Sequence, residues 1–139
     1  MKLIVTPGRL FQQDPRAISS DLAGLTILVA EDEFLLAAQI EDELRSASCS
    51  VLGPCTSVAQ ALQTSRAQRF DLALLDINLR GEMIYPVIDE LRSRRVPFVL
   101  LSGYSAVNLP ERLRDMPRVA KPHDPAMLLR EMRRALGKI

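Results

Sequence analysis

The residues of this sequence with the clearest chemical potential are polar side chains that directly follow short apolar runs. They are Glu31, Asp32, Asp76, Ser102 and Lys121. Three carboxylates held close together repel one another, which raises their pKa values or requires a cation. A hard divalent ion such as Mg²⁺ (or Mn²⁺), shared between carboxylates, water and phosphate oxygens, would relieve that repulsion.

Asp76 has the residue type of a nucleophile that accepts a phosphoryl group, because carboxylates can form aspartyl-phosphates. Lys121 would offer a positive charge to Asp76 or to the phosphate, and the Ser102 hydroxyl would donate a hydrogen bond to a phosphoryl oxygen. A carboxylate after four apolar residues is costly to desolvate, so we expect a functional reason for Asp76. Glu31 and Asp32 taken alone would also fit an ordinary helix start, where acids complement the helix dipole.

These side chains can meet only if the apolar runs are neighbouring strands. The continuous apolar runs at residues 27–30, 72–75 and 96–101 predict strands that are buried on both faces. Shorter strands are predicted at residues 50–54 and 119–120. Apolar residues at helical spacing follow Asp32 and Ser57, which we expect to be N-caps, and recur in residues 85–94 and 126–136.

Strands that alternate with helices predict an α/β fold whose parallel sheet has helices on both faces. For five strands with right-handed crossovers, we expect the flavodoxin-like, doubly wound order 2-1-3-4-5, with the chemistry beyond the carboxyl ends of the strands. Only 18 residues separate Ser102 from Lys121, and Pro110 and Pro117 are among them. We therefore expect a shortened or mobile fourth helix.

Length and composition predict a single domain. The chain has 139 residues, of which 47% are hydrophobic and 25% are charged. Residues 25–139 are predicted to form the domain, and residues 1–24, which show no sustained period, a flexible N-terminal tail.

A net charge of +1 gives no sign of a nucleic-acid partner. No apolar run has the length of a membrane span or signal peptide, so we expect a cytoplasmic protein with Cys49 and Cys55 as ordinary reduced thiols.

Four segments resemble the signatures of response-regulator receiver domains, the phosphoacceptors of bacterial two-component signalling. They are residues 27–33, 74–79, 101–103 and 121–122. The resemblance covers about residues 25–137, which is nearly the whole chain.

The resemblance implies a role for each matching position. Glu31 and Asp32 would hold Mg²⁺ together with Asp76, the phosphoacceptor, and the backbone carbonyl of Asn78 would complete the metal shell. Ser102 would sense the phosphate. Lys121 would pair with the phosphate, and its peptide bond to Pro122 would be cis.

Residues 78–82, 96–98 and 102–104 are further similar to the FAT GUY branch of stand-alone receivers, although residues 99–102 replace the usual Phe-Ala-Thr run. Receivers commonly place a Tyr or Phe three residues before the lysine, as a switch that swings inward on phosphorylation. This sequence has Arg118 there, so the usual aromatic switch cannot operate. Tyr104 is a candidate substitute.

The family resemblance implies a stand-alone response regulator, a signalling domain rather than an enzyme beyond its own phosphorylation and dephosphorylation. A sensor histidine kinase would supply the phosphoryl group. The output would be altered protein contacts or phosphate shuttling to a histidine phosphotransfer protein, from a monomer or weak dimer that binds neither nucleic acid nor membrane. Because only one helix fits after Lys121, we expect no output domain.

Two alternatives stay open: a pseudo-receiver that binds partners without phosphorylation, and a haloacid-dehalogenase-like phosphatase. Such phosphatases carry an acid two residues after the nucleophile, where this chain has Asn78. His123 is predicted to be a loop residue. A basic set near the C-terminus is either ordinary helix-end charge or a docking surface for an acidic partner: Arg112, Arg114, Arg118, Arg130, Arg133, Arg134 and Lys138.

Overall fold

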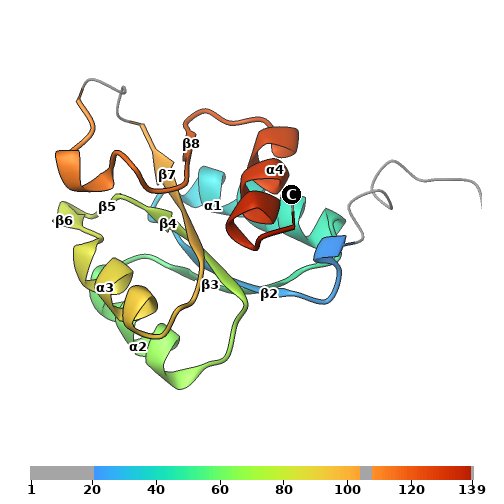
Figure 1. The fold of residues 1–139 in the computed structure, drawn as a ribbon, viewed down its shortest axis with the longest axis horizontal. Helices are drawn as coiled ribbons and strands as arrows, with labels where there is room; N and C mark the ends of the chain where they lie inside the picture. The colour runs from blue at the N-terminus through green and yellow to red at the C-terminus, as the bar shows by residue number, and fades with distance from the viewer. Residues whose placement is uncertain (1–20, 104–107, 139) are drawn as a thin grey trace, which may run out of the picture.

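The computed structural model describes residues 21–103 and 108–138. At its centre lies a five-stranded parallel sheet in the order β3-β2-β4-β7-β8 (Figure 1). The strands are β2 (Thr26–Ala30), β3 (Ser50–Cys55), β4 (Leu72–Asp76), β7 (Phe98–Ser102) and β8 (Arg118–Ala120). Counted in chain order within this sheet, the arrangement is 2-1-3-4-5, so the predicted flavodoxin-like topology is confirmed.

The four α-helices of the described residues cover both faces of the sheet, two on each face (Figure 1). Their bounds are α1 (Phe34–Ser46), α2 (Val58–Ala67), α3 (Tyr85–Ser93) and α4 (Pro125–Ala135). Alternate residues of β2 point to opposite faces: Leu28 packs in the cluster with α2 and α3, and Val29 packs in the cluster with α1 and α4. Burial on both faces explains why the strands are apolar throughout. None of the helices in the described ranges is long and apolar enough to cross a membrane.

The helix starts were predicted with mixed success. Ser57 caps α2, because its side chain accepts a hydrogen bond from the backbone N–H of Gln60 at 3.1 Å. The prediction that Asp32 caps the first helix was wrong. Glu33 occupies the N-cap of α1 without a side-chain hydrogen bond, while the Asp32 carboxylate accepts the backbone N–H of Arg80 at 3.0 Å. A contact distant in sequence has taken the place of the local cap.

The packed region begins a few residues before the predicted boundary at residue 25. Leu22 is fully buried in the cluster with α1 and α4. Beside it, the Asp21 carboxylate pairs with Arg133 of α4 at 3.1 Å. Residues 1–20, which hold most of the predicted tail, lie outside the described residues.

The segment between β7 and β8, where a shortened or mobile fourth helix was predicted, contains a single helical turn in the part that the structure describes. Between β7 and β8 the described residues contain the 3₁₀ turn η2 (Glu111–Leu113) and no α-helix. Leu109 and Leu113 pack against the α2–α3 side of the sheet, so this segment still closes the core. The Arg112 guanidinium lies 4.7 Å from the ring centre of Tyr85 and pairs with Asp89, both on α3. The shortening is confirmed for this part of the chain, and mobility stays a prediction.

Candidate functional site

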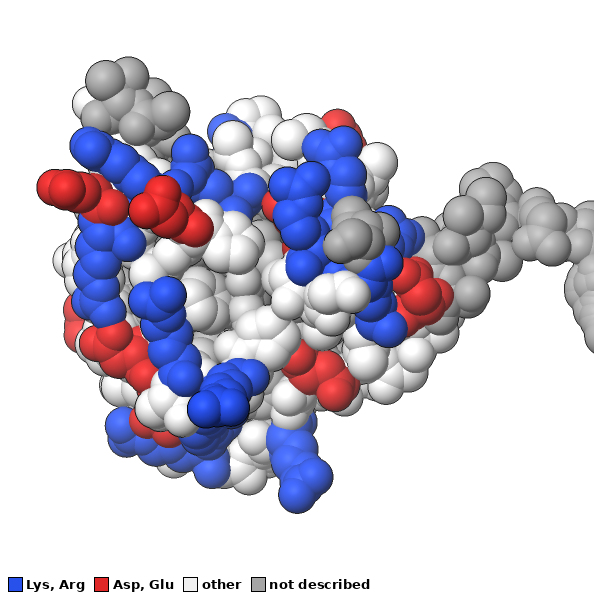
Figure 2. Space-filling model, viewed as in Figure 1, with Lys and Arg blue, Asp and Glu red and all other residues white. Residues whose placement is uncertain are grey.

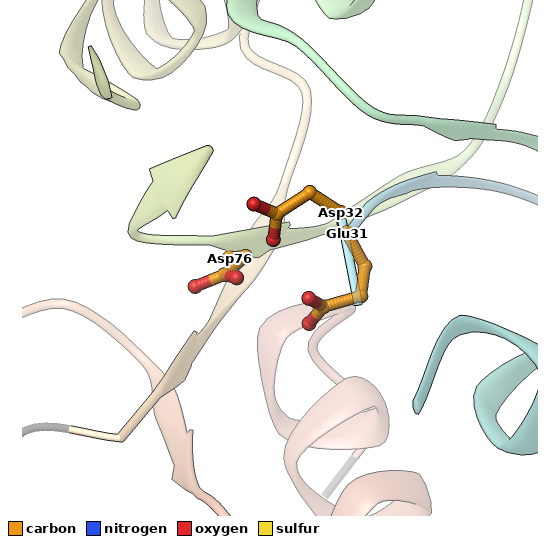
Figure 3. Close-up of side chains that lie close together, drawn as sticks. All are labelled: Glu31, Asp32 and Asp76. Atoms are coloured by element: carbon orange, nitrogen blue, oxygen red, sulfur yellow. The ribbon is translucent and has the colours of Figure 1, made fainter. Parts of the chain in front are cut away.

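Three carboxylates gather at the carboxyl ends of two adjacent strands. Glu31 and Asp32 follow β2, and Asp76 ends β4, which pairs with β2 in parallel. One ligand oxygen from each lies within 4.8 Å of the others. Figure 3 shows the three side chains extending from their strands toward a common space. The structure therefore brings together the acidic residues that the sequence predicted to meet.

Glu31 is the most deeply buried member of this group, with none of its surface exposed. Its Oε2 accepts the backbone N–H of Glu33 at 3.0 Å. Its Oε1 lies 2.9 Å from the Lys121 ammonium as an ion pair, yet it has no hydrogen bond of ordinary geometry among the described residues. Burial raises the pKa of the Glu31 carboxyl, and the Glu33 amide and Lys121 oppose that rise without cancelling it.

Lys121 joins the group from the loop after β8. Its Nζ lies 3.1 Å from Asp76 Oδ2, besides its contact with Glu31. Its backbone N–H donates to the Ser102 carbonyl at 2.7 Å, and its bond to Pro122 is cis, as the family resemblance implied. Burial acts to lower the pKa of Lys121, but the two carboxylates outweigh it, so the net shift is upward. The ammonium therefore stays charged near neutral pH.

A small hairpin, absent from the sequence predictions, closes one side of the site. It consists of β5 (Asn78–Leu79) and β6 (Glu82–Met83), joined by Arg80 and Gly81. Both joining residues have positive φ angles, 53° and 87°, as a two-residue type I′ turn requires. The Gly81 N–H donates to the Asn78 side-chain oxygen at 2.8 Å. The Asn78 N–H in turn points to Asp76 Oδ1 at 3.4 Å, so the hairpin helps to place the Asp76 carboxylate.

The predicted switch residues have separate outcomes. Ser102 is buried at the end of β7, one residue beyond Leu101, which is in register with Asp76. Arg118 begins β8, and its guanidinium donates to the Arg114 carbonyl at 2.9 Å. Tyr104 lies outside the described residues. Ser102 thus ends the strand next to that of Asp76, and no aromatic ring occupies position 118.

His123 lies in the loop after β8, as predicted, but it is buried. Its Nε2 is 2.7 Å from Oε1 of Glu43 on α1. The partner is 80 residues away in sequence, so no local signal could have revealed it. The contact therefore connects the loop that carries Lys121 to helix α1.

The basic residues near the C-terminus do not form one unpaired surface. Arg112 pairs with Asp89 and Arg133 with Asp21. Arg130 and Arg134 both lie near Glu131, at 3.9 and 3.7 Å. This predicted docking surface therefore has less unpaired charge than the sequence suggests.

The donor set fits a hard divalent cation. Three carboxylates face one ammonium, so the group keeps a net negative charge. The ligand atoms are all oxygens, which Mg²⁺ and Mn²⁺ prefer. Oε1 of Glu31 is buried without an ordinary hydrogen bond, so it has acceptor capacity left for an ion.

Fold and site together define a doubly wound α/β protein with an acidic site and a lysine at the carboxyl edge of its parallel sheet. Residues 27–133 match the response regulator receiver domain family, and the chain belongs to that family.

Relatives with curated names and solved structures support this assignment. Transcriptional regulatory protein PdtaR of Mycobacterium tuberculosis is 28% identical over 90 residues, 64% of this chain and 44% of that protein, so the chain spans less than half of its relative. SdrG from Sphingomonas melonis Fr1 is 36% identical with a TM-score of 0.72, covering 81% of this chain and 95% of that one. The receiver domain of sensor histidine kinase PA1611 from Pseudomonas aeruginosa PAO1, solved with a magnesium ion in its active-site cleft, is 31% identical with a TM-score of 0.72, covering 83% and 99%. The likeness to SdrG agrees with the FAT GUY resemblance.

Proposed function

We propose that this receiver domain accepts a phosphoryl group on Asp76 in a Mg²⁺-dependent reaction. The observation that carries the proposal is the geometry around Asp76: its carboxylate lies with those of Glu31 and Asp32 within 4.8 Å, and 3.1 Å from the Lys121 ammonium. The magnesium ion in the cleft of the PA1611 receiver domain supports the choice of cation.

Each residue has a defined part in the proposed reaction. Glu31, Asp32 and Asp76 would hold the ion, with the Asn78 carbonyl as a further ligand. When bound, Mg²⁺ (or Mn²⁺) supplies positive charge that offsets the repulsion between carboxylates and phosphoryl oxygens. An Asp76 oxygen would form the new bond to phosphorus while the bond between phosphorus and a histidine nitrogen of the phosphoryl donor breaks. Lys121 and Ser102 hold the phosphoryl oxygens by charge and by a donated hydrogen bond.

The donor we propose is a phosphohistidine of a sensor histidine kinase, which fits a cytoplasmic receiver. Phe34 and Leu35 open α1 directly after the acidic site, and 82% and 81% of their surfaces are exposed. Two large apolar side chains beside a charged site suit an apolar contact with the protein that brings the phosphoryl group. The downstream partner would be a histidine phosphotransfer protein or another protein that distinguishes the phosphorylated form.

The test combines Mg²⁺ with beryllofluoride, a phosphoryl mimic, and follows backbone amides by NMR. We expect Mg²⁺-dependent shifts centred on Asp76 and Lys121, loss of the beryllofluoride response in Asp76→Asn, and retention in Asp42→Asn, an exposed acid on α1. A protein without any Mg²⁺-dependent response would be a pseudo-receiver, a reading that Arg118 at the switch position favours. Steady turnover of many small phosphoesters would instead identify a phosphatase.

A further inference from the structure

Five arginines gather at the edge of the molecule opposite the acidic site. This arginine edge consists of Arg66, Arg69, Arg92, Arg94 and Arg95, from the ends of α2 and α3 and the turns that follow them. Figure 2 shows Lys and Arg side chains gathered along the lower part of the molecule, where Figure 1 draws these helices. β4 begins beside this edge, at Leu72, and ends at Asp76, so the length of the strand separates the two regions.

Two adjoining hollows lie between these arginines. One has a volume of about 680 Å³ and is lined by Arg66, Arg69 and Arg94, and the other has about 540 Å³ and is lined by Arg92 and Arg95. Both hollows are open to solvent and share Asp71 and Val96. The rest of the lining is mixed, with polar Thr26 and Gln68 beside seven apolar residues: Leu25, Ala67, Phe70, Val96, Pro97, Ala135 and Leu136. The edge thus offers guanidinium groups beside apolar side chains.

The arginine edge has more positive charge than its own acids neutralise. Glu90 pairs with Arg66 at 3.1 Å and with Arg94 at 3.8 Å. Asp71 accepts the backbone N–H of Thr26 at 2.8 Å. Five arginines against these two carboxylates leave a net charge of +3. Within residues 21–103 and 108–138, no ion pair joins Arg69, Arg92 or Arg95 to a carboxylate, so three guanidinium groups remain for an external anion.

We propose that the arginine edge docks an acidic segment of a partner protein. Guanidinium groups bind carboxylates with two parallel hydrogen bonds, and apolar side chains between the acids would contact the apolar residues of the lining. Small-molecule sites usually enclose most of their ligand, so two open, adjoining hollows suit an extended peptide chain better. Residues 1–20 of this chain are a poor occupant, because they carry Lys2, Arg9 and Arg16 against Asp14 alone.

A protein segment fits this edge better than a nucleic acid. Phe70 is the one aromatic residue in the lining and is half-buried, so no platform exists on which successive bases could stack. The chain as a whole has a net charge of only +1, which gives little long-range attraction for a polyanion. Because the arginine edge and Asp76 lie at opposite ends of the sheet, this proposal does not depend on phosphorylation.

The probe is a fluorescein-labelled peptide of Glu-Glu-Leu repeats, and its binding is measured by fluorescence anisotropy at low and high salt. We expect the double variant Arg69→Glu/Arg95→Glu to bind at least tenfold more weakly, equivalent to about 1.4 kcal/mol. The matched control, Arg130→Glu/Arg134→Glu, reverses two charges on α4 and should change the dissociation constant less than twofold. A peptide with Gln in place of each Glu should not bind, and high salt should weaken binding of the acidic peptide.

Three outcomes would overturn the proposal. The first is no binding of the acidic peptide at low salt, and the second is equal binding by the Arg69→Glu/Arg95→Glu variant, whose folding is checked by its melting temperature. The third is tighter binding of a single-stranded RNA oligonucleotide than of the peptide, with loss in the same variant, which would assign the edge to nucleic acid. The beryllofluoride response of the variant is recorded separately, so failure at the arginine edge is distinguishable from failure at Asp76.

Discussion

Replacing Lys121 with methionine should destabilise the fold at neutral pH because the buried Glu31 carboxyl then loses the ammonium that compensates it. The lysine ammonium lies 2.9 Å from Glu31 and 3.1 Å from Asp76, and 18% of its side chain remains exposed. Removing one partner of a fully buried ion pair costs about 3–5 kcal/mol. Because water reaches Lys121 in part, we expect the free energy of unfolding to fall by about 2–4 kcal/mol.

The pH dependence of this loss has a definite sign. The folded-state pKa of Glu31 is raised above its ordinary value of 4.5, so the folded protein binds more protons than the unfolded chain above that pH. Stability from this group is therefore present at low pH and is lost as the pH rises through the folded-state pKa. Lys121 lowers the pKa of Glu31, so the folded-state pKa of Glu31 should be higher still in Lys121→Met. The stability of the variant should therefore recover in part as the pH is lowered. Lys121 itself has a raised pKa, so its own contribution is constant until alkaline pH.

The assay is urea unfolding of the wild type, Lys121→Met, Glu31→Gln and the double variant, at pH 5 and pH 7. The double variant should lose less than the sum of the single losses, with a coupling of about 1–3 kcal/mol. Lys138→Met, at an exposed position, serves as control and should change stability by less than about 0.5 kcal/mol. Wild-type stability of Lys121→Met at pH 7, or a loss that grows on acidification, would refute the reasoning.

Three further substitutions or reactions probe other parts of the structure. Arg112→Ala should speed amide exchange in residues 108–117 and cost about 1 kcal/mol, because it removes a cation–π contact and an exposed ion pair to α3; unchanged exchange would contradict this. Gly53→Ala should cost about 2–4 kcal/mol in thermal unfolding, because φ is +104° and a Cβ would lie 2.6 Å from the Val29 carbonyl; a neutral result would contradict the close approach. Cys49 and Cys55 should react slowly with thiol reagents until the protein unfolds, because burial raises both pKa values; rapid labelling of the native protein would show otherwise.

The sheet was predictable because burial requires apolar strands, and the meeting of the acids was predictable because the strands are parallel. Strands covered on both faces must be apolar throughout, and parallel strands end at one edge, so the sequence alone predicts Asp76 beside Glu31. The hairpin β5–β6 could not be predicted in this way, because strands of two residues show no period and Gly81 was its only local signal. The contact between Asp32 and the Arg80 amide was missed for a related reason, since it joins residues 48 positions apart.

The contacts of Lys121 indicate which secondary-structure elements a change at Asp76 would reach in a receiver that has no aromatic ring at position 118. Phosphorylation would add about −1.5 to −2 charges beside an ammonium that already contacts two carboxylates. The backbone N–H of Lys121 is hydrogen-bonded to the end of β7, at the Ser102 carbonyl. Two residues later, His123 is held by Glu43 of α1, so the loop is fixed at both ends. A displacement of the Lys121 backbone would therefore reach β7 through Ser102 and α1 through His123 and Glu43, and neither route involves Arg118.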